Sequence, residues 1–188
     1  MRTLQPQADK VELVNPVGEV ITELQRIHPN GLYEGRMEGK IQPYRLRLQA
    51  GNHRWEIDDP YRFPSPLGEL DRHLMAEGTH RRLHDTLGAR PIELEGVGGV
   101  YFSVWAPNAR RVSVVGPFND WDGRRHPMRL HPGNGVWDIF VPGLGAGELY
   151  KFELLGADGN LQPLKADPFA RAMEPPPGNA SIVHESRY

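Results

Sequence analysis

The chain has 188 residues, of which 38% are hydrophobic and 24% charged, and its formal net charge is −2. This size and composition are those of a globular protein with one or two domains, and they exclude a chain that is disordered throughout. The absence of cysteine excludes disulfide bonds and thiolate metal sites, and the slight acidity excludes a strongly basic coat for nucleic acid.

The sequence shows no targeting or membrane segment. The first residues contain a single basic residue, Arg2, and no apolar stretch that would form a signal peptide. No run approaches the ~20 apolar residues that span a bilayer. Together with the lack of cysteine, which suits a reducing compartment, these features predict a cytoplasmic protein without a membrane partner.

In the first part of the chain, short runs of β-branched and aromatic residues alternate with turn residues, as is typical of strands joined by tight turns. Tyr44, Leu46 and Leu48 alternate with polar residues, which indicates an antiparallel strand with one buried face. The predicted strands are Lys10–Val14, Glu19–Leu24, Leu32–Met37, Tyr44–Gln49 and His53–Ile57.

A helical pattern then interrupts the strands. Ser65 is a good N-cap, and Pro66 suits the first position of a helix. Leucine recurs with helical spacing from Leu67 to Leu74, and Gly78 is a typical stop. This predicts a helix over about 66–77 and a short helical turn over 80–87. We expect residues 61–90 to form a helical linker between two β domains.

The strands return after Pro91, with a spacing near ten residues that is typical of an immunoglobulin-like β-sandwich. The predicted fold is therefore all-β, with two such sandwiches over residues 1–60 and 91–188 and an extended C-terminal tail. The predicted strands of the second sandwich are Val100–Trp105, Val112–Val115, Met128–Leu130, Gly135–Val141 and Leu149–Leu155.

The most informative loop is Phe118-Asn119-Asp120-Trp121-Asp122-Gly123, which is rich in turn residues and carries a large aromatic side chain. An indole on such a loop can stack on the apolar face of a sugar ring, while neighbouring amides and carboxylates bind the hydroxyl groups. The alternative interpretation is that Trp121 folds back over the sandwich as part of its packing.

The other tryptophans suggest structural roles. Trp105 and Trp137 lie in predicted strands among apolar residues, so we expect both in the core, whereas Trp55 lies in a polar strand and suits either place.

The charged and catalytic motifs are weaker signals. Arg124-Arg125-His126 and Arg110-Arg111 suit a phosphate site or, alternatively, a solvated loop in which the arginines pair with Asp120 and Asp122. His80 and His84 stand four residues apart, but a third ligand at matching spacing is missing, so no metal is predicted. The sequence lacks a phosphate-binding glycine loop and a nucleophile elbow.

From residue 58 onward the sequence resembles the N-terminal region of bacterial 1,4-α-glucan branching enzymes of the α-amylase superfamily. The resemblance is carried by DDPYRF at 58–63, FSVWAPNARRVSVVG at 102–116 and FNDWDGRRHPM at 118–128, with shorter matches that continue to KADP at 165–168. Residues 4–57 resemble the family's extra N-terminal sandwich at lower similarity.

This resemblance implies an accessory sandwich followed by a glucan-binding module, which precedes a catalytic (β/α)₈ barrel in the family. The motifs that carry the catalytic carboxylates have no counterpart here, so a non-catalytic, cofactor-free segment is implied that is inactive alone. The first strands of the family's first sandwich are also missing. We therefore expect an incomplete first domain that can self-associate through an open sheet edge.

The resemblance also implies a glucan site. Trp121 corresponds to a stacking tryptophan of related modules, Lys151 to a lysine that binds sugar hydroxyls, and Asn179 to a third ligand. Asn119, beside Trp121, joins this set, whereas the second stacking aromatic of related modules falls near Leu161. The expected partners are an α-glucan such as glycogen and the catalytic barrel of the same parent protein. In the alternative reading, the segment is a structural module that only packs against that barrel.

Overall fold

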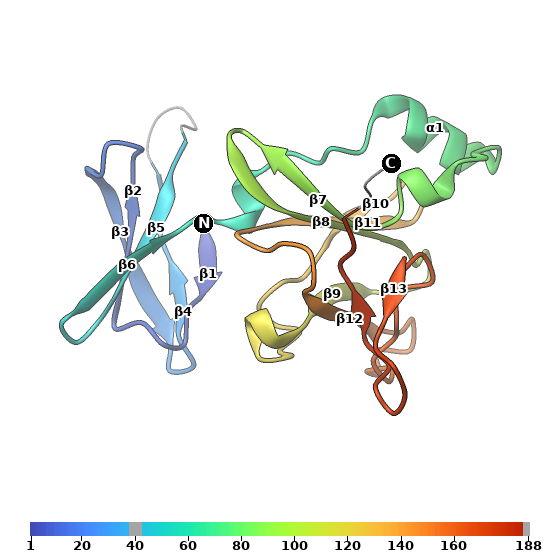
Figure 1. The fold of residues 1–188 in the computed structure, drawn as a ribbon. Coiled ribbons are helices and arrows are strands. Elements are labelled where there is room, and N and C mark those ends of the chain that lie inside the picture. The colour runs from blue at the N-terminus through green and yellow to red at the C-terminus, as the bar shows by residue number, and fades with distance from the viewer. Residues whose placement is uncertain (38–42, 186–188) are drawn as a thin grey trace. The chain divides into compact units, whose positions relative to one another are not determined.

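The computed structural model describes residues 1–37 and 43–185, and it divides into two compact units, Met1–Arg62 and Phe63–Tyr188 (Figure 1). Strands dominate both units, and the described residues contain no (β/α)₈ barrel. The prediction of an all-β fold is confirmed. The predicted strand Leu32–Met37 is shorter than expected, because β4 ends at Glu34.

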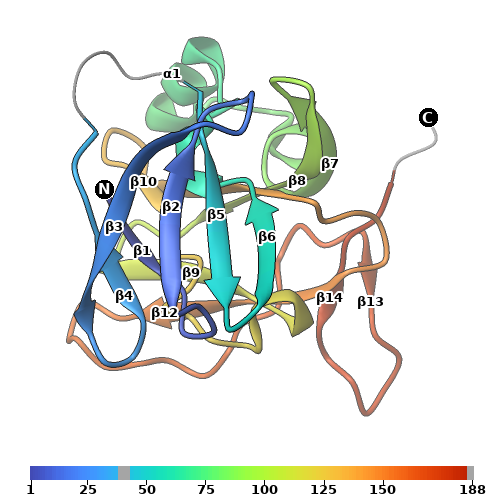
Figure 2. The same ribbon diagram turned by 90° about the vertical axis from the view of Figure 1, so that its left-hand side faces the viewer.

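The first unit is an antiparallel sheet in the order β1-β4-β3-β2-β5-β6, whose central strands stand side by side in Figure 2. Its core is formed by the apolar residues of β2, β5 and their neighbours, which include Val11, Leu13, Leu46 and Leu48. The strands are β1 (Arg2–Leu4), β2 (Lys10–Val14), β3 (Val20–His28), β4 (Leu32–Glu34), β5 (Arg45–Ala50) and β6 (His53–Ile57).

The long strand β3 takes part in both halves of this sheet. Its first part pairs with β2 and its last part pairs with β4, and the register of the second pairing shifts between Arg26 and His28. Such a bulge increases the local twist, so one strand serves two groups of strands.

The second unit is a sandwich of two four-stranded sheets, β10-β11-β8-β7 and β13-β14-β12-β9. Alternate residues of β8, β11, β9 and β12 meet between the sheets, with Phe102, Trp137 and Phe152 among the largest. The strands are β7 (Gly88–Leu94), β8 (Val97–Trp105), β9 (Arg111–Val115), β10 (Arg129–His131), β11 (Val136–Pro142), β12 (Leu149–Leu155), β13 (Ala172–Met173) and β14 (Ser181–Ile182).

The segment expected as a linker packs on the second unit. Leu67 and Leu87 are buried against Val136 of β11, and Phe63 is buried against Tyr101 and Phe140. In Figure 1, helix α1 lies over the sheet that contains β7 and β8, on the side away from β9 and β12. Residues 63–87 therefore cover the outer face of this sheet, whereas the prediction had given 61–90 to a separate linker.

Helix α1 runs over Glu69–Glu77 and begins three residues later than predicted. The expected N-cap, Ser65, instead donates a hydrogen bond to the buried carboxylate of Asp138 on β11. Gly68 occupies the N-cap, and Gly78 ends the helix in the left-handed conformation as expected. Short 3₁₀ turns lie at Pro60–Arg62 (η1), Leu83–Asp85 (η2) and Pro117–Asn119 (η3).

Candidate functional site

The loop that carries Trp121 begins where β9 ends. The 3₁₀ turn η3 follows Gly116, and the backbone N–H of Trp121 returns to donate to the Gly116 carbonyl oxygen at 2.9 Å. Phe118 turns inward and packs against the core, whereas Trp121 is 37% exposed. The loop thus separates an anchoring aromatic from one that solvent can reach.

Two consecutive residues in this loop, Asp120 and Trp121, have positive φ angles of 57° and 58°. This left-handed conformation is uncommon for residues other than glycine. It sets the direction in which the indole leaves the backbone, and the hydrogen bonds around Gly116 hold it.

The side chain of Asn119 has a structural role instead of the direct glucan contact that was expected. Asn119 is fully buried. Its Oδ1 accepts from the Gly116 N–H at 2.9 Å, and its Nδ2 donates to the Val114 carbonyl at 2.9 Å and to His126 Nδ1 at 2.8 Å. Because Asn119 is fully buried and bonded to three neighbouring groups, a sugar cannot reach it, and it instead positions the Trp121 loop.

The contact with Asn119 also fixes the state of His126. The amide nitrogen of Asn119 can only donate, so His126 Nδ1 must accept, which requires a neutral imidazole. Burial and, to a lesser extent, the charge of Arg125 lower the pKa of His126 from 6.5 to about 4. At neutral pH the imidazole is therefore uncharged, as the loop requires.

A pH dependence of stability follows. Above pH 6.5, His126 is neutral in both the folded and the unfolded chain and contributes no pH dependence to the free energy of unfolding. As the pH falls from 6.5 to about 4, the unfolded chain binds a proton that the folded chain resists, so unfolding becomes easier. The full difference corresponds to about 3 kcal/mol at 1.36 kcal/mol per pKa unit. We expect denaturant titrations at several pH values to show this loss.

The control is His126→Asn, which keeps an acceptor near the position of Nδ1 but does not titrate. Its free energy of unfolding should fall less between pH 6.5 and 4 than that of the parent chain, which isolates His126 from the carboxylates that titrate in the same range. Equal slopes in the two proteins would show that His126 is not the group responsible.

The structure brings Lys151 and Asn179 together, although 28 positions separate them in the sequence. Lys151 lies on β12, where its neighbours Tyr150 and Phe152 point into the core, so its own side chain is on the outer face. The Lys151 ammonium donates a hydrogen bond to Oδ1 of Asn179, which precedes β14. Two of the four expected site residues are thus in direct contact.

The Trp121 loop starts beside this pair. In the register of the sheet, Lys151 is directly opposite Val115, the last residue of β9, and the Trp121 N–H binds the next residue, Gly116. The loop also passes over β12, because a Cβ atom on Gly123 would lie 2.0 Å from Oε1 of Glu153. Trp121, Lys151 and Asn179 therefore belong to one end of the sheet formed by β9, β12 and β14.

The basic residues near the site are paired with acidic ones. Arg124 Nη2 lies 2.7 Å from the Asp122 carboxylate, and Arg125 Nη1 lies 3.0 Å from Asp120. Arg111 forms an ion pair with Glu153 on the outer face of the sheet. These contacts agree with the solvated-loop interpretation of the arginines, and the phosphate interpretation receives no support from them.

Among the other aromatic residues, Trp137 is buried as predicted, but the prediction for Trp105 is wrong. Trp105 is 61% exposed, and its indole N–H donates to the Asn134 carbonyl at 3.0 Å. It is the last residue of β8 and faces outward, because Val104 takes the inward position before it. Trp55 is half-buried and stacks on His53. Leu161, at the position where the resemblance implies a second stacking aromatic, is exposed.

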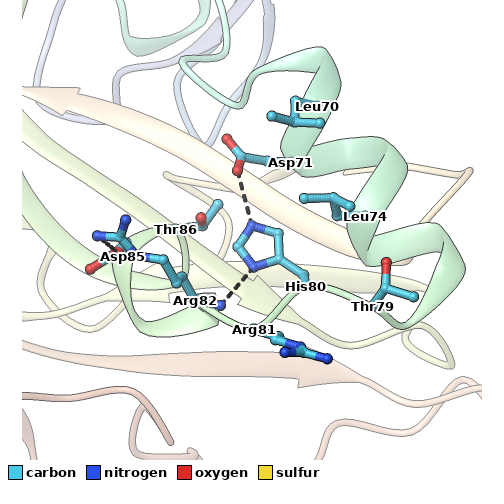
Figure 3. Close-up of a pocket in the computed structure, with 9 residues that line it drawn as sticks. All are labelled: Leu70, Asp71, Leu74, Thr79, His80, Arg81, Arg82, Asp85 and Thr86. Carbon is cyan, nitrogen blue, oxygen red and sulfur yellow. Dashed lines mark hydrogen bonds and ion pairs between the residues drawn. The ribbon is translucent and has the colours of Figure 1, made fainter.

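A separate pocket of about 510 Å³ lies between α1 and residues 79–86 (Figure 3). His80 lines this pocket. Its Nε2 lies 2.9 Å from the Asp71 carboxylate, and its Nδ1 accepts from the Arg82 N–H at 3.2 Å. His84 instead is exposed and lies beside Asp85. Both ring nitrogens of His80 are therefore occupied, and the described part of the chain holds no group of three side chains suited to a metal.

Two family models match the chain. Residues 1–61 match the model described as alpha-1,4-glucan branching enzyme GlgB, N-terminal domain, and residues 86–170 match carbohydrate-binding module 48, the isoamylase N-terminal domain. Within residues 1–37 and 43–185, none of the helices has the length and hydrophobicity that a membrane span requires.

The chain is 57% identical over 185 residues to the 1,4-alpha-glucan branching enzyme GlgB of Cereibacter sphaeroides and 54% identical over 186 residues to that of Paramagnetospirillum magneticum. Each match covers 98% of this chain but only 25% of the relative, so the chain spans about a quarter of their length. Among solved structures, pullulanase from Anoxybacillus sp. LM18-11 complexed with maltotriose aligns over 95% of this chain and 24% of its own, with 19% identity and a TM-score of 0.42.

Proposed function

We propose that this chain, which corresponds to the N-terminal region of the 1,4-alpha-glucan branching enzymes, binds α-glucan through its second unit. The site lies at the end of β9, β12 and β14, where Trp121 stacks on a glucose ring and Lys151 and Asn179 bind its hydroxyl groups. The observation that carries the proposal is the contact between Lys151 and Asn179 beside the Trp121 loop, because sequence distance alone gives no reason for it.

The chemistry of the three side chains suits a sugar. A glucose ring has an apolar C–H face that packs on an indole, and a rim of hydroxyl groups that both donate and accept hydrogen bonds. The ammonium of Lys151 has three donors, of which Asn179 uses one. The amide nitrogen of Asn179 remains a donor. The pair therefore presents hydrogen-bond donors next to the aromatic surface, while the buried side chain of Asn119 holds the Trp121 loop in place.

An α-glucan is favoured over an anionic ligand because the nearby arginines are neutralised by carboxylates. Arg111, Arg124 and Arg125 each have an acidic partner, whereas Lys151 donates to the neutral amide of Asn179. A neutral polymer with many hydroxyl groups matches this balance better than a phosphate.

We propose a non-catalytic role for the chain itself and assign the reaction to the whole protein. That reaction, which the resemblance implies to be the cleavage of an α-1,4 bond and transfer of the chain to a 6-hydroxyl, is proposed for the full-length protein, because this chain spans about a quarter of its relatives' length. In this scheme the second unit holds or orients the glucan for a catalytic barrel, and the protein works in the cytoplasm without a cofactor in this region.

The competing role is that of a structural module that packs against the barrel. The observation in its favour is Trp105, whose indole is 61% exposed on the opposite sheet and suits a protein contact. A second copy of the chain is also a proposed partner, because β1 and β6 end the sheet of the first unit and each has one side that no other strand of the described residues pairs with.

Titration with maltoheptaose, followed by NMR, tests the binding role. Because the site has a single aromatic platform, we expect weak binding in the millimolar range, which corresponds to about 4 kcal/mol in total. The Trp121 indole N–H, the Lys151 side chain and the Asn179 amide should shift together with one dissociation constant, while Trp105 should not move.

The matched control sugar is cellohexaose, whose β-1,4 linkages direct successive rings differently. Shifts confined to Trp105, or equal shifts with both sugars, would contradict the proposed site.

A further inference from the structure

A buried hydrogen-bonded group lies directly beneath the proposed glucan ligands. The Tyr150 hydroxyl donates to Oδ2 of Asp167 at 2.6 Å, and the Asp167 backbone N–H donates to the Ser181 hydroxyl at 2.9 Å. All three residues are at most 4% exposed. We name this group, Tyr150, Asp167 and Ser181, the Tyr–Asp latch. It fastens β12 and β14 to the turn that follows residue 165.

The latch adjoins the sugar ligands on both strands. Tyr150 is the residue before Lys151 and is opposite Ser181 in the pairing of β12 with β14. Ser181 in turn follows Asn179 by two positions. The separation of the Lys151 ammonium from the Asn179 amide therefore depends on how these two strands are held together. β14 is two residues long, pairs with β13, and is followed by Val183, whose backbone bonds to Gly147 and Glu148.

Because the latch is buried, the loss of one of its hydrogen bonds would leave a polar group without a partner and away from water. Desolvation raises the pKa of the Asp167 carboxyl, and desolvation together with that carboxylate raises the pKa of Tyr150. A buried carboxylate that loses its donor is costly, so removal of the phenol hydroxyl should move the strands or admit water.

The first unit contains the same arrangement. The Tyr44 hydroxyl donates to Oδ2 of Asp59 at 2.6 Å, and Oδ1 of Asp59 accepts from the N–H two residues on, at 3.0 Å. In the second unit, Oδ1 of Asp167 likewise accepts from the N–H two residues on, at 2.8 Å. Both aspartates precede a proline and an aromatic residue, and burial raises the pKa of both.

The strands around the two latches also correspond. In the first unit, β4 pairs with β1 on one side and β3 on the other, and β11 pairs in the same way with β8 and β10 in the second unit. The pair formed by β2 and β5 likewise corresponds to the pair formed by β9 and β12. In the first unit, β5 follows Tyr44 and pairs with β6, which precedes Asp59. In the second unit, β12 contains Tyr150 and pairs with residues 161–165, which precede Asp167.

The strand that changes partners is equivalent as well. β3 pairs first with β2 and then with β4. In the second unit, residues 126–128 bond to β9 and the chain then continues as β10 against β11. Two copies of one module account for this agreement in topology, in strand switching and in the latch.

Comparison of the copies separates the shared framework from the site. Arg45 occupies the position of Lys151 but is held by Glu56 and Asp58 at 3.2 and 3.6 Å. The connection after β2 is a short turn from Asn15 to Glu19, where the second unit has the Trp121 loop. No strand among the described residues of the first unit corresponds to β14.

We propose that the Tyr–Asp latch positions Lys151 and Asn179 for glucan, and that it is the closing element of a module that occurs twice in the chain. The inference rests on the proposed glucan function of the second unit. Because the first unit has the latch without the site, it supplies an internal control: the same deletion can be made in both copies, and only one copy should change sugar binding.

The test compares Tyr150→Phe with Tyr44→Phe in the 188-residue chain. Both variants lose one phenol hydroxyl and leave a buried carboxylate without that donor, so both should lower the midpoint of thermal unfolding. Only Tyr150→Phe should weaken maltoheptaose binding, by roughly threefold to tenfold, the range that the net worth of one hydrogen bond implies. Asp167→Asn should bind close to the parent, because its amide nitrogen can donate to the Tyr150 hydroxyl.

A measurement without sugar accompanies the titration. In Tyr150→Phe the NMR signals of the Asn179 side-chain amide should shift, because its contact with Lys151 changes, whereas in Tyr44→Phe they should stay in place. Unchanged Asn179 signals in Tyr150→Phe would overturn the inference whatever the sugar does.

Trp121→Ala distinguishes the two levels of the argument. Loss of binding in Trp121→Ala but parental binding in Tyr150→Phe would overturn the latch inference and leave the glucan site in place. Parental binding in Trp121→Ala would overturn the glucan site itself. Equal weakening by Tyr150→Phe and Tyr44→Phe would show that the effect is one of general stability.

Discussion

Replacement of Trp121 by alanine is expected to make binding of maltoheptaose undetectable while the chain stays folded. The indole is 37% exposed and its loop is held by backbone bonds and by Asn119, so its removal leaves those contacts intact. Stacking of a base on an aromatic side chain, a loose analogue for a sugar, contributes ~1–3 kcal/mol. A millimolar complex has only about 4 kcal/mol in total, so this loss takes it out of range.

Isothermal titration or NMR with a short oligosaccharide is the right measurement, because the many chain ends of glycogen give an avidity that hides a weak site. Lys151→Ala should cost less, since water can replace part of its contact with a hydroxyl group.

The matched control is Trp105→Ala, which removes an equally large and more exposed indole from the other sheet. It should leave sugar binding unchanged. A Trp121→Ala protein that unfolds several degrees earlier and binds maltoheptaose as the parent does would instead identify Trp121 as a packing residue.

Asn119→Ala is expected to cost both stability and binding. The substitution leaves the buried Gly116 N–H and Val114 carbonyl without partners and takes the hydrogen bond from His126. Each unsatisfied buried group costs about 1–3 kcal/mol, so we expect a total loss of roughly 3 kcal/mol. For a unit of this size that lowers the unfolding midpoint by on the order of 10 °C. Thermal unfolding and the maltoheptaose titration measure the two effects.

Asp120→Asn serves as the neighbouring control. Its carboxylate is largely exposed and pairs with Arg125, and asparagine tolerates the left-handed backbone at this position. Surface ion pairs of this kind contribute about 0–1 kcal/mol, so little change is expected. If Asn119→Ala were as stable as Asp120→Asn, Asn119 would not hold the loop.

The sequence predicts the strands best where a clear alternation of apolar and polar residues meets strong turn residues. The bounds of β2, β6 and β12 are as predicted. The sequence does not predict β7, because the strand contains Gly88 and Pro91, which usually break strands, although an edge strand tolerates proline. β13 and β14 have two residues each, too few for any periodicity to register.

The candidate site was predictable only in part. The loop around Trp121 is visible from its turn residues, but the role of Asn119 is not, because an asparagine beside an aromatic suits either a ligand or a cap. The prediction places Trp105 in the core because it ends an apolar strand, but the sequence does not reveal that the last residue of β8 is exposed while the six residues before it are buried. The pairing of Lys151 with Asn179 came from family resemblance, since nothing local links two residues so far apart.

The internal duplication is another feature that the sequence alone does not establish. The two units share a topology and a Tyr–Asp pair, yet their sequences do not align convincingly, because a β core accepts many combinations of apolar residues of similar volume. The polar pair is retained in both units, where a buried carboxylate requires a partner.

The consecutive left-handed residues Asp120 and Trp121 have a thermodynamic consequence for recognition. A loop that became ordered only around its ligand would give up conformational entropy during binding and would associate slowly. Here folding itself has already restricted the backbone on both sides of the indole. A glucan chain that arrives at this surface meets a preorganised ring, so the entropy lost on association is mainly that of the sugar. Helical α-glucan, whose own torsions are already restricted, should therefore bind with a smaller entropic penalty than a short, flexible oligosaccharide.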